Sequence, residues 1–215
     1  MIAIRFLISA LLIGLLAGCV TGPTPPEAKQ LAVLASTADL HEKARACQEL
    51  AVIGGPASVP ALAALLNQEH LADYARSGLE GIQDRSAGDA LRKALGELKG
   101  RYLAGAVNSL GVRRDVAAVP DLQRLALDPN SGVADEALAS LGMIGNAEAV
   151  KTLQKVLTDG PAERRLPAAH AALVAAAQLT KDGNRVAARS LLENVVRKLP
   201  PGNLVDTAKR QAAAL

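Results

Sequence analysis

The sequence predicts an all-α protein, specifically a right-handed α-solenoid of stacked antiparallel helix pairs. Two observations favour this fold class. Half of the 215 residues are hydrophobic, yet aromatic residues make up only 1% and tryptophan is absent. This composition disfavours a β-sandwich, because strands are enriched in aromatic and β-branched residues, and it favours helices rich in alanine and leucine. A motif also recurs about every thirty residues, which is typical of repeat architectures.

The repeat is anchored on four leucines, which recur at steps of 29, 31 and 31 residues. An alanine stands four residues before each anchor, and a second leucine stands twelve residues after it. The anchors are Leu50, Leu79, Leu110 and Leu141; the alanines are Ala46, Ala75, Ala106 and Ala137; the second leucines are Leu62, Leu91, Leu122 and Leu153. An alanine one helical turn from the anchor lets neighbouring helices approach closely.

Each unit is expected to contain a first helix that ends near the anchor leucine, a short turn and a second helix. Pro60 and Pro120 fall in the expected first turn of the second helix, where a missing amide costs nothing. In the second unit, residues 85–89 replace the usual turn, so the register there depends on Leu79 and Leu91. The units are predicted at residues 40–68, 69–99, 100–129 and 130–159.

These units resemble HEAT repeats, in the short form found in many bacterial proteins. The segment ALASLGMIGNAEAV, residues 137–150, is the closest match, and the resemblance covers roughly residues 40–160. It departs from the long HEAT repeat, which has about 40 residues or more per unit. The resemblance implies a superhelix whose second helices line a concave surface that binds partners.

Residues 28–215 are expected to form the solenoid, with end units that differ from the inner ones. A longer helix is predicted over 162–181, followed by an Asp-Gly-Asn turn and a helix through Lys198. This pair, residues 160–199, resembles a tetratricopeptide unit. Residues 203–215 predict a capping helix, and residues 27–36 predict a cap at the other end, because inner units leave both flanks apolar.

The N-terminus has the features of a bacterial lipoprotein. Residues 1–18 resemble a signal peptide, with one positive charge at Arg5 and an apolar stretch shorter than the roughly 20 residues of a membrane span. Leu16-Ala17-Gly18-Cys19 resembles a lipobox, which implies cleavage before Cys19 and lipidation of its thiol. Residues 19–27 are expected to form a lipidated, proline-rich tether. An ordinary signal peptide with a coincidental cysteine is the alternative.

Acyl chains on Cys19 would hold the mature chain on a membrane without spanning it. Val20 replaces the aspartate that signals inner-membrane retention in lipoproteins of this kind. We therefore expect an extracytoplasmic location, on the periplasmic face of the outer membrane if the host has two membranes. The mature chain contains only one further cysteine, Cys47, so no intramolecular disulfide is expected.

The sequence predicts no catalytic residue, metal, cofactor or small-molecule substrate. His41, His70 and His170 lie at different phases of the repeat and form no cluster with cysteine, which argues against a zinc site. Cys47 is expected to be a small buried side chain. The formal charge of +3 falls by one when Arg5 is removed, and so weak an excess argues against nucleic acid.

Long polar side chains recur at two positions of the second helices. The residues one and two places after the second leucine are Ala63 and Ala64 in the first unit and polar in the next three. Stacked helices lie about 10 Å apart, so these side chains are expected to line up. They are predicted to bind a protein or an acidic peptide segment, although a solvated helix face is the alternative. The set is Arg92, Lys93, Gln123, Arg124, Gln154 and Lys155.

The favoured hypothesis is a membrane-anchored, non-catalytic protein–protein interaction scaffold of the bacterial cell envelope. An accessory or lyase-like subunit of an envelope enzyme is a second hypothesis, since HEAT-like repeats serve in phycobilin lyases. A structural spacer of the envelope and the HEAT-repeat portion of a larger secreted protein are further alternatives.

Overall fold

The structure, a computed structural model, describes residues 22–215, so the signal peptide and Cys19 lie outside the described residues. Across 22–215 it contains twelve α-helices, two short 3-10 helices and no strand, and the predicted all-α class is confirmed. The α-helices are α1 (Pro25–Ala35), α2 (Leu40–Ile53), α3 (Val59–Ala63), α4 (Ala72–Gly81), α5 (Arg85–Ala94), α6 (Gly100–Val112), α7 (Val119–Leu127), α8 (Ala134–Ile144), α9 (Ala147–Asp159), α10 (Ala162–Lys181), α11 (Arg185–Lys198) and α12 (Asn203–Ala213). The 3-10 helices are η1 (Pro56–Ser58) and η2 (Val116–Ala118).

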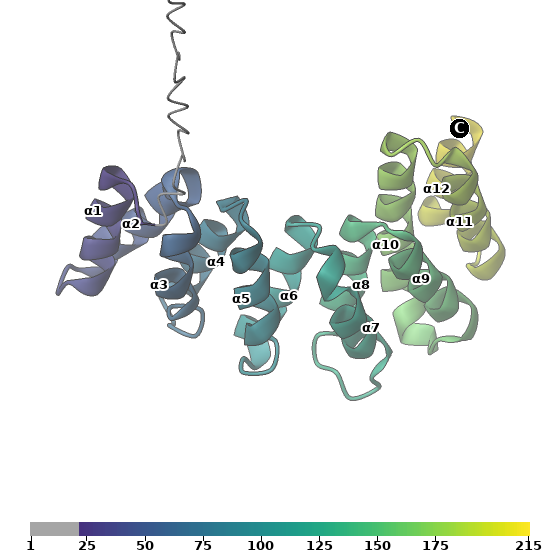
Figure 1. Cartoon of the computed structure of the whole chain (residues 1–215). Helices are drawn as coiled ribbons and strands as arrows, with labels where there is room; N and C mark the ends of the chain where they lie inside the picture. The colour runs from purple at the N-terminus through teal and green to yellow at the C-terminus, as the bar shows by residue number, and fades with distance from the viewer. Residues whose placement is uncertain (1–21) are drawn as a thin grey trace, which may run out of the picture.

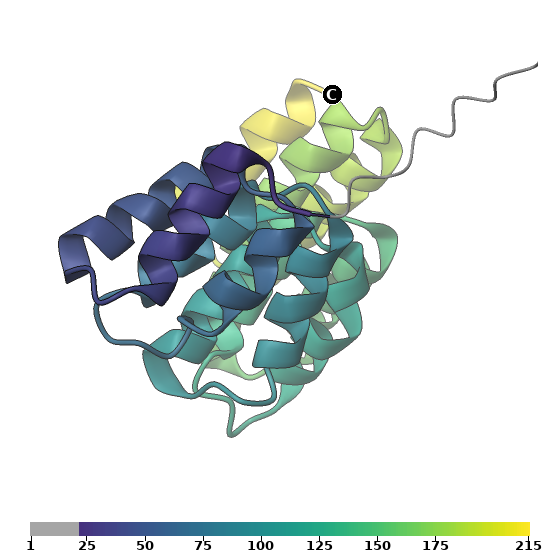
Figure 2. The same ribbon diagram turned by 60° about the vertical axis from the view of Figure 1, so that its left-hand side comes forward.

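The helices stack as pairs in a single row, which confirms the α-solenoid (Figure 1). The first helices, α2, α4, α6, α8 and α10, contact one another in sequence and form the first-helix layer. The second helices, α3, α5, α7, α9 and α11, form the second-helix layer, in which α3 packs on α5, and α9 packs on both α7 and α11. In Figure 2 the N-terminal helices come forward, and the yellow α12 lies at the opposite end of the stack.

The three sequence columns form the centre of the core. Every anchor leucine, every alanine four residues before it and every leucine twelve residues after it is 0% exposed. Burying one leucine side chain contributes about 2 kcal/mol, so these positions contribute substantially to the stability of each unit. The recurring spacing therefore reflects the packing requirement of each helix pair.

Small residues next to the anchors allow the first helices to pack closely. A Cβ atom at Gly111 would lie 2.8 Å from the Ser140 Cα atom, and a Cβ atom at Gly142 would lie 2.6 Å from the Ala171 carbonyl oxygen. The short distance between α6 and α8 also allows a hydrogen bond, which Ser140 donates from Oγ to the Val107 carbonyl oxygen over 2.9 Å. Bulky aromatic side chains would not fit at these contacts.

The second unit differs from the sequence prediction at its turn. Residues 85–89 lie in the first turns of α5 and do not form the turn itself. Asp84 is the N-cap of α5, and its carboxylate accepts a hydrogen bond from the Ser86 amide over 2.9 Å. An aspartate N-cap satisfies a helix amide that otherwise has no partner, so the turn between α4 and α5 can be very short.

The N-terminal cap begins earlier than predicted, because α1 starts at Pro25 inside the expected tether. Prolines are tolerated in the first helical turn, where the amide needs no partner. Thr24 and Glu27 form a reciprocal capping box, and α1 packs against α2. Glu27 also accepts hydrogen bonds from the Gly55 amide over 2.8 Å and the Ser58 hydroxyl over 2.6 Å. This buried carboxylate therefore ties α1 to the first repeat unit.

At the other end, α12 packs on α11 but diverges from the long helix α10. The inner first helices pack tightly, whereas the α10–α12 contact leaves an apolar cavity. None of the helices described here is both long and apolar enough to cross a membrane.

Candidate functional site

The structure separates the six predicted binding residues into two groups. Arg92, Gln123 and Gln154 are half-buried. Arg92 forms ion pairs with Asp89 on its own helix and with Asp115 in the next unit. Gln123 donates from Nε2 to the Thr152 hydroxyl over 2.7 Å. The side chains of Arg92 and Gln123 therefore join one unit to the next.

The second group, Lys93, Arg124 and Lys155, is exposed on α5, α7 and α9. We call these three residues the cation line. Lys93 lies 3.9 Å from Glu97 in the turn after α5, and Arg124 lies 3.2 Å from Asp121 on its own helix. Exposed pairs of this kind contribute about 0–1 kcal/mol, so a partner carboxylate can compete for these cations.

A polar cavity of about 270 Å³ opens between α5 and the turn before α7. Its lining includes Arg92, Arg113 and Asp115, and burial lowers the pKa of Arg113 below its ordinary value. Gly88 stands where the first, third and fourth units have valine, and a Cβ atom there would lie 2.3 Å from Asp115 Oδ2. The missing side chain leaves room for the Asp115 carboxylate. Sequence reasoning missed Arg113 and Asp115, because their partners Leu79 and Arg92 lie 34 and 23 residues away along the chain.

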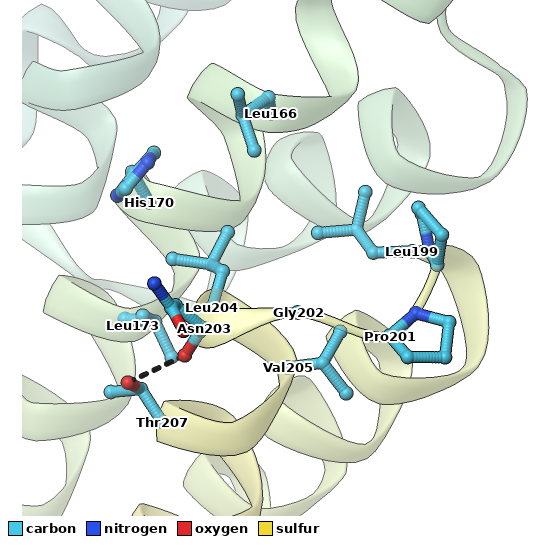
Figure 3. A pocket seen from close by; sticks show the side chains of 11 residues that line it. Leu166, His170, Leu173, Leu199, Pro201, Gly202, Asn203, Leu204, Val205 and Thr207 are labelled. Atoms are coloured by element: carbon cyan, nitrogen blue, oxygen red, sulfur yellow. Dashed lines mark hydrogen bonds between the residues drawn. The ribbon is translucent and has the colours of Figure 1, made fainter.

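The apolar cavity between α10 and α12 has a volume of about 630 Å³ and is open to solvent (Figure 3). Leu166, His170 and Leu173 line it from α10, and Leu204 lines it from α12. The loop between α11 and α12 closes one side with Leu199, Pro200 and Pro201. The divergence of α12 from α10 therefore creates the kind of concave apolar space that ligands and anchoring side chains occupy.

The cavity between α10 and α12 has a mainly apolar lining with few polar groups, which suits the binding of an apolar group. The polar groups among its lining residues are the His170 imidazole, the Asn203 amide and the Thr207 hydroxyl, which donates to the Asn203 carbonyl oxygen over 2.8 Å. The Thr207 hydroxyl is thus engaged by its own helix. Over residues 22–215, no three His, Cys, Asp or Glu side chains are grouped as a metal site would require.

Cys47 lies inside α2 and is 0% exposed, as the sequence predicts. Burial raises the pKa of its thiol to about 11. A thiol with so high a pKa is almost entirely protonated at neutral pH, which removes its nucleophilic form. Cys47 is therefore a packing residue of the first unit.

Comparison with known families places HEAT repeats at residues 88–174. The matched segment runs from α5 into α10 and contains the whole cation line. A search of curated proteins gave no match. The chain therefore carries HEAT repeats in an all-α solenoid, a fold that generally serves as a protein-interaction scaffold and is typically non-catalytic.

Proposed function

We propose that this chain is a membrane-anchored, non-catalytic interaction scaffold of the bacterial cell envelope. In this proposal the solenoid binds an acidic segment of a partner protein on the exposed face of the second-helix layer. The observation that carries the proposal is the cation line, because Lys93, Arg124 and Lys155 occupy the same exposed position on the second helices of three successive units of the HEAT-repeat region.

The spacing of the cation line suits an extended acidic segment. Neighbouring helices lie about 10 Å apart, and an extended chain advances about 3.3 Å per residue. A carboxylate at every third residue of the partner would therefore meet one cation per unit. In this arrangement Arg92 and Gln123 act as positioning residues. Arg92 holds α5 against the turn before α7, and Gln123 holds α7 against α9. Gln154 lies half-buried at the same position of α9.

The anchor in this proposal is the lipidated Cys19, followed by a short tether. Helix α1 begins at Pro25, six positions after Cys19. Six extended residues span about 20 Å at most, so the N-terminal end of the solenoid would lie close to the membrane surface. The tether thus presents the second-helix layer within reach of other envelope proteins.

The proposal is tested by affinity capture from detergent-solubilised membranes of the native host. The test variant carries Lys93→Glu, Arg124→Glu and Lys155→Glu. The matched control carries Lys29→Glu, Arg45→Glu and Lys181→Glu, which change the net charge equally at exposed sites away from the second-helix layer. We expect one acidic partner with the wild type and the control, and its loss with the test variant. Equal capture by both variants would remove the cation line from the proposal.

The anchor is tested separately with Cys19→Ser, by fractionation and by metabolic labelling with a palmitate analogue. The wild-type chain should be labelled and should sediment with membranes, whereas Cys19→Ser should be unlabelled and should not. An unlabelled wild-type chain would contradict the lipoprotein part of the proposal and leave the binding part standing.

A second candidate function, an accessory subunit that holds an apolar group, is favoured by the cavity between α10 and α12. Its test is titration with a fluorescent apolar probe such as anilinonaphthalene sulfonate. Leu166→Asp should abolish probe binding, because Leu166 lies at the mouth of the cavity and is 55% exposed. Val112→Asp is the matched control, since Val112 is 49% exposed on a different unit. Probe binding unaffected by Leu166→Asp would exclude this cavity.

A further inference from the structure

The seam between a second helix and the next first helix is filled inside the stack. Helix α11, for example, lies against both α9 and α10 and closes the seam between them. Each second helix therefore has two roles, pairing with its own first helix and covering the preceding unit. Helices α11 and α12 form a seam of the same kind. By analogy with α11, a further second helix would be expected to cover it.

No helix of residues 22–215 occupies this last seam, which is hollow. Two adjoining cavities of about 410 and 370 Å³ lie along it and share Glu193. They extend along α11 from Arg185 to Arg197, and α12 and the residues after it contribute Lys209, Ala212 and Leu215. Because a helix rises 1.5 Å per residue, the seam is about 18 Å long, enough for three to four helical turns.

The floor of the seam is apolar. Val196, Ala212 and Leu215 pack against the core and remain partly exposed. Val186, at the N-terminal end of the seam, is a large apolar side chain that is 83% exposed. An apolar floor with raised sides is the shape that recognises the apolar face of an amphipathic helix.

The sides of the seam are cationic. Arg185, Arg189, Arg197 and Lys209 line it, against the single carboxylate of Glu193. Within the described part of the chain, none of these four cations forms an ion pair. Several cations of the inner units, such as Arg76, Arg92 and Arg124, are instead paired with an acidic side chain.

We propose that the α11–α12 seam is a docking site for an acidic amphipathic helix of a partner protein. The partner helix occupies the place of the next second helix, with its apolar face on Val196 and Leu215 and its acidic flanks beside Arg189 and Arg197. The concave apolar floor favours a helix over a flat anionic membrane, and the four unpaired cations select an acidic one. The inference rests on the proposed function only in that the chain binds protein, because this seam is separate from the cation line.

The test uses displayed random peptides of about 15 residues, roughly four helical turns, as the probe. The library is selected against the full chain in detergent and counter-selected against the full chain carrying Arg189→Glu and Arg197→Glu. We expect enrichment of sequences with apolar residues at helical spacing and an excess of Asp and Glu. One enriched peptide is then labelled, and its Kd is measured by fluorescence anisotropy.

We expect Arg189→Glu with Arg197→Glu to raise the Kd of that peptide about tenfold or more, because it replaces attraction by repulsion at two places. Val186→Asp should raise the Kd as well. Lys93→Glu with Arg124→Glu, which reverses two charges on the cation line, should leave the Kd unchanged and so separates this seam from the proposed function. Circular dichroism confirms that each variant is folded.

Three results would overturn the inference. The first is selection of peptides without an acidic excess or without helical spacing, or no selection at all. The second is binding to vesicles of phosphatidylglycerol that Arg189→Glu with Arg197→Glu abolishes, in the absence of peptide binding, which would assign the seam to a membrane surface. The third is a dimer in light scattering that the same variant dissociates, which would assign the seam to a second copy of the chain.

Discussion

Arg113 and Arg114 are adjacent in the sequence, yet their guanidinium groups bind the ends of helices on opposite sides of their own unit. Arg113 donates to the Leu79 carbonyl oxygen over 2.6 Å, at the C-terminal end of α4, and to the Asp84 carbonyl oxygen over 3.1 Å, at the N-cap of α5. Arg114 donates to the Ile144 carbonyl oxygen over 3.4 Å, at the C-terminal end of α8. Cations at helix C-termini satisfy free carbonyl groups and oppose the negative end of the helix dipole. One turn of the third unit therefore holds both neighbouring units.

Arg113→Ala is expected to lower the free energy of unfolding by about 2 kcal/mol or more, because it removes charged hydrogen bonds from partly buried carbonyl groups. Arg113→Lys should restore less than half of that loss, since one ammonium group cannot reach all of these carbonyl oxygens. The measurement is urea denaturation followed by circular dichroism. Arg85→Ala, at a site 89% exposed in its side chain, is the control and should change the value by about 0.5 kcal/mol or less.

Arg114 has a φ of +51°, in the left-handed region that favours glycine. Arg114→Gly and Arg114→Ala both remove the bonds to Ile144 and Asp182, but only glycine also relieves the backbone strain. We therefore expect the glycine variant to be more stable than the alanine variant by about 1 kcal/mol. Equal stability of the two variants in urea denaturation would show that this turn changes its conformation when Arg114 is replaced.

The attachment of α1 to the first repeat unit through Glu27 is expected to depend on pH. Burial by itself raises the pKa of this carboxyl, but hydrogen bonds from Ser58, Gly55 and Thr24 together hold the pKa below its ordinary value. A lowered folded-state pKa means that the carboxylate contributes stability above the ordinary glutamate pKa. This contribution is lost as the pH falls through the lower folded-state pKa.

The measurement for Glu27 is the free energy of unfolding of the wild type minus that of Glu27→Gln, followed from neutral to acid pH. The difference should be about 1–2 kcal/mol near neutral pH and should shrink as the pH falls. Subtracting the variant removes the contribution of the other carboxylates. A difference that does not change with pH would mean that the charge of Glu27 has no part in holding α1.

The close contact of α8 with α10 at Gly142 leaves no room for a larger side chain at this position. Gly142→Ala should cost about 1–3 kcal/mol, because the new Cβ atom would lie 2.6 Å from a backbone oxygen that cannot rotate away. Gly132→Ala is the control, since a Cβ atom there meets nothing within 4 Å. Thermal denaturation should show a lower Tm for the first variant alone. A lower Tm for both would point to a general effect of replacing glycine.

Cys47 is expected to resist thiol reagents in the folded chain. With a pKa of about 11, about one thiol in a thousand is ionised at pH 8, and the side chain is also buried. Ellman's reagent should therefore modify Cys47 slowly in a Cys19→Ser chain and rapidly after unfolding in urea. Rapid modification of the folded chain would show that α2 opens frequently.

The repeat register is the property that local sequence information specifies best. Leucine and alanine at constant spacing place the same face of every helix in the core, and a helix has 3.6 residues per turn whatever lies around it. The buried positions of Leu50, Leu110 and Leu141 therefore follow from the spacing alone. Pro60 and Pro120 likewise mark the first turns of α3 and α7, because a helix tolerates proline best in its first turn.

The roles of the polar residues on the second helices could be predicted from the sequence only in part. Spacing places Arg92 and Lys93 side by side in the sequence, but successive residues point about 100° apart around a helix. One therefore faces the next unit and the other faces solvent, and the sequence does not say which neighbour Arg92 meets. The absence of a side chain at Gly88 becomes intelligible only when Asp115 is placed against it.

The all-α class, the helix pairs and the buried columns follow from local sequence pattern, because they depend on contacts within about one repeat. The helix capping by Arg113 and Arg114, the attachment of α1 through Glu27, the cavity beside α10 and the hollow seam of α11 and α12 arise only when the units are packed together. Each of these depends on the angle at which one unit meets the next. That angle is set by many small side-chain contacts between units, and no short motif encodes it.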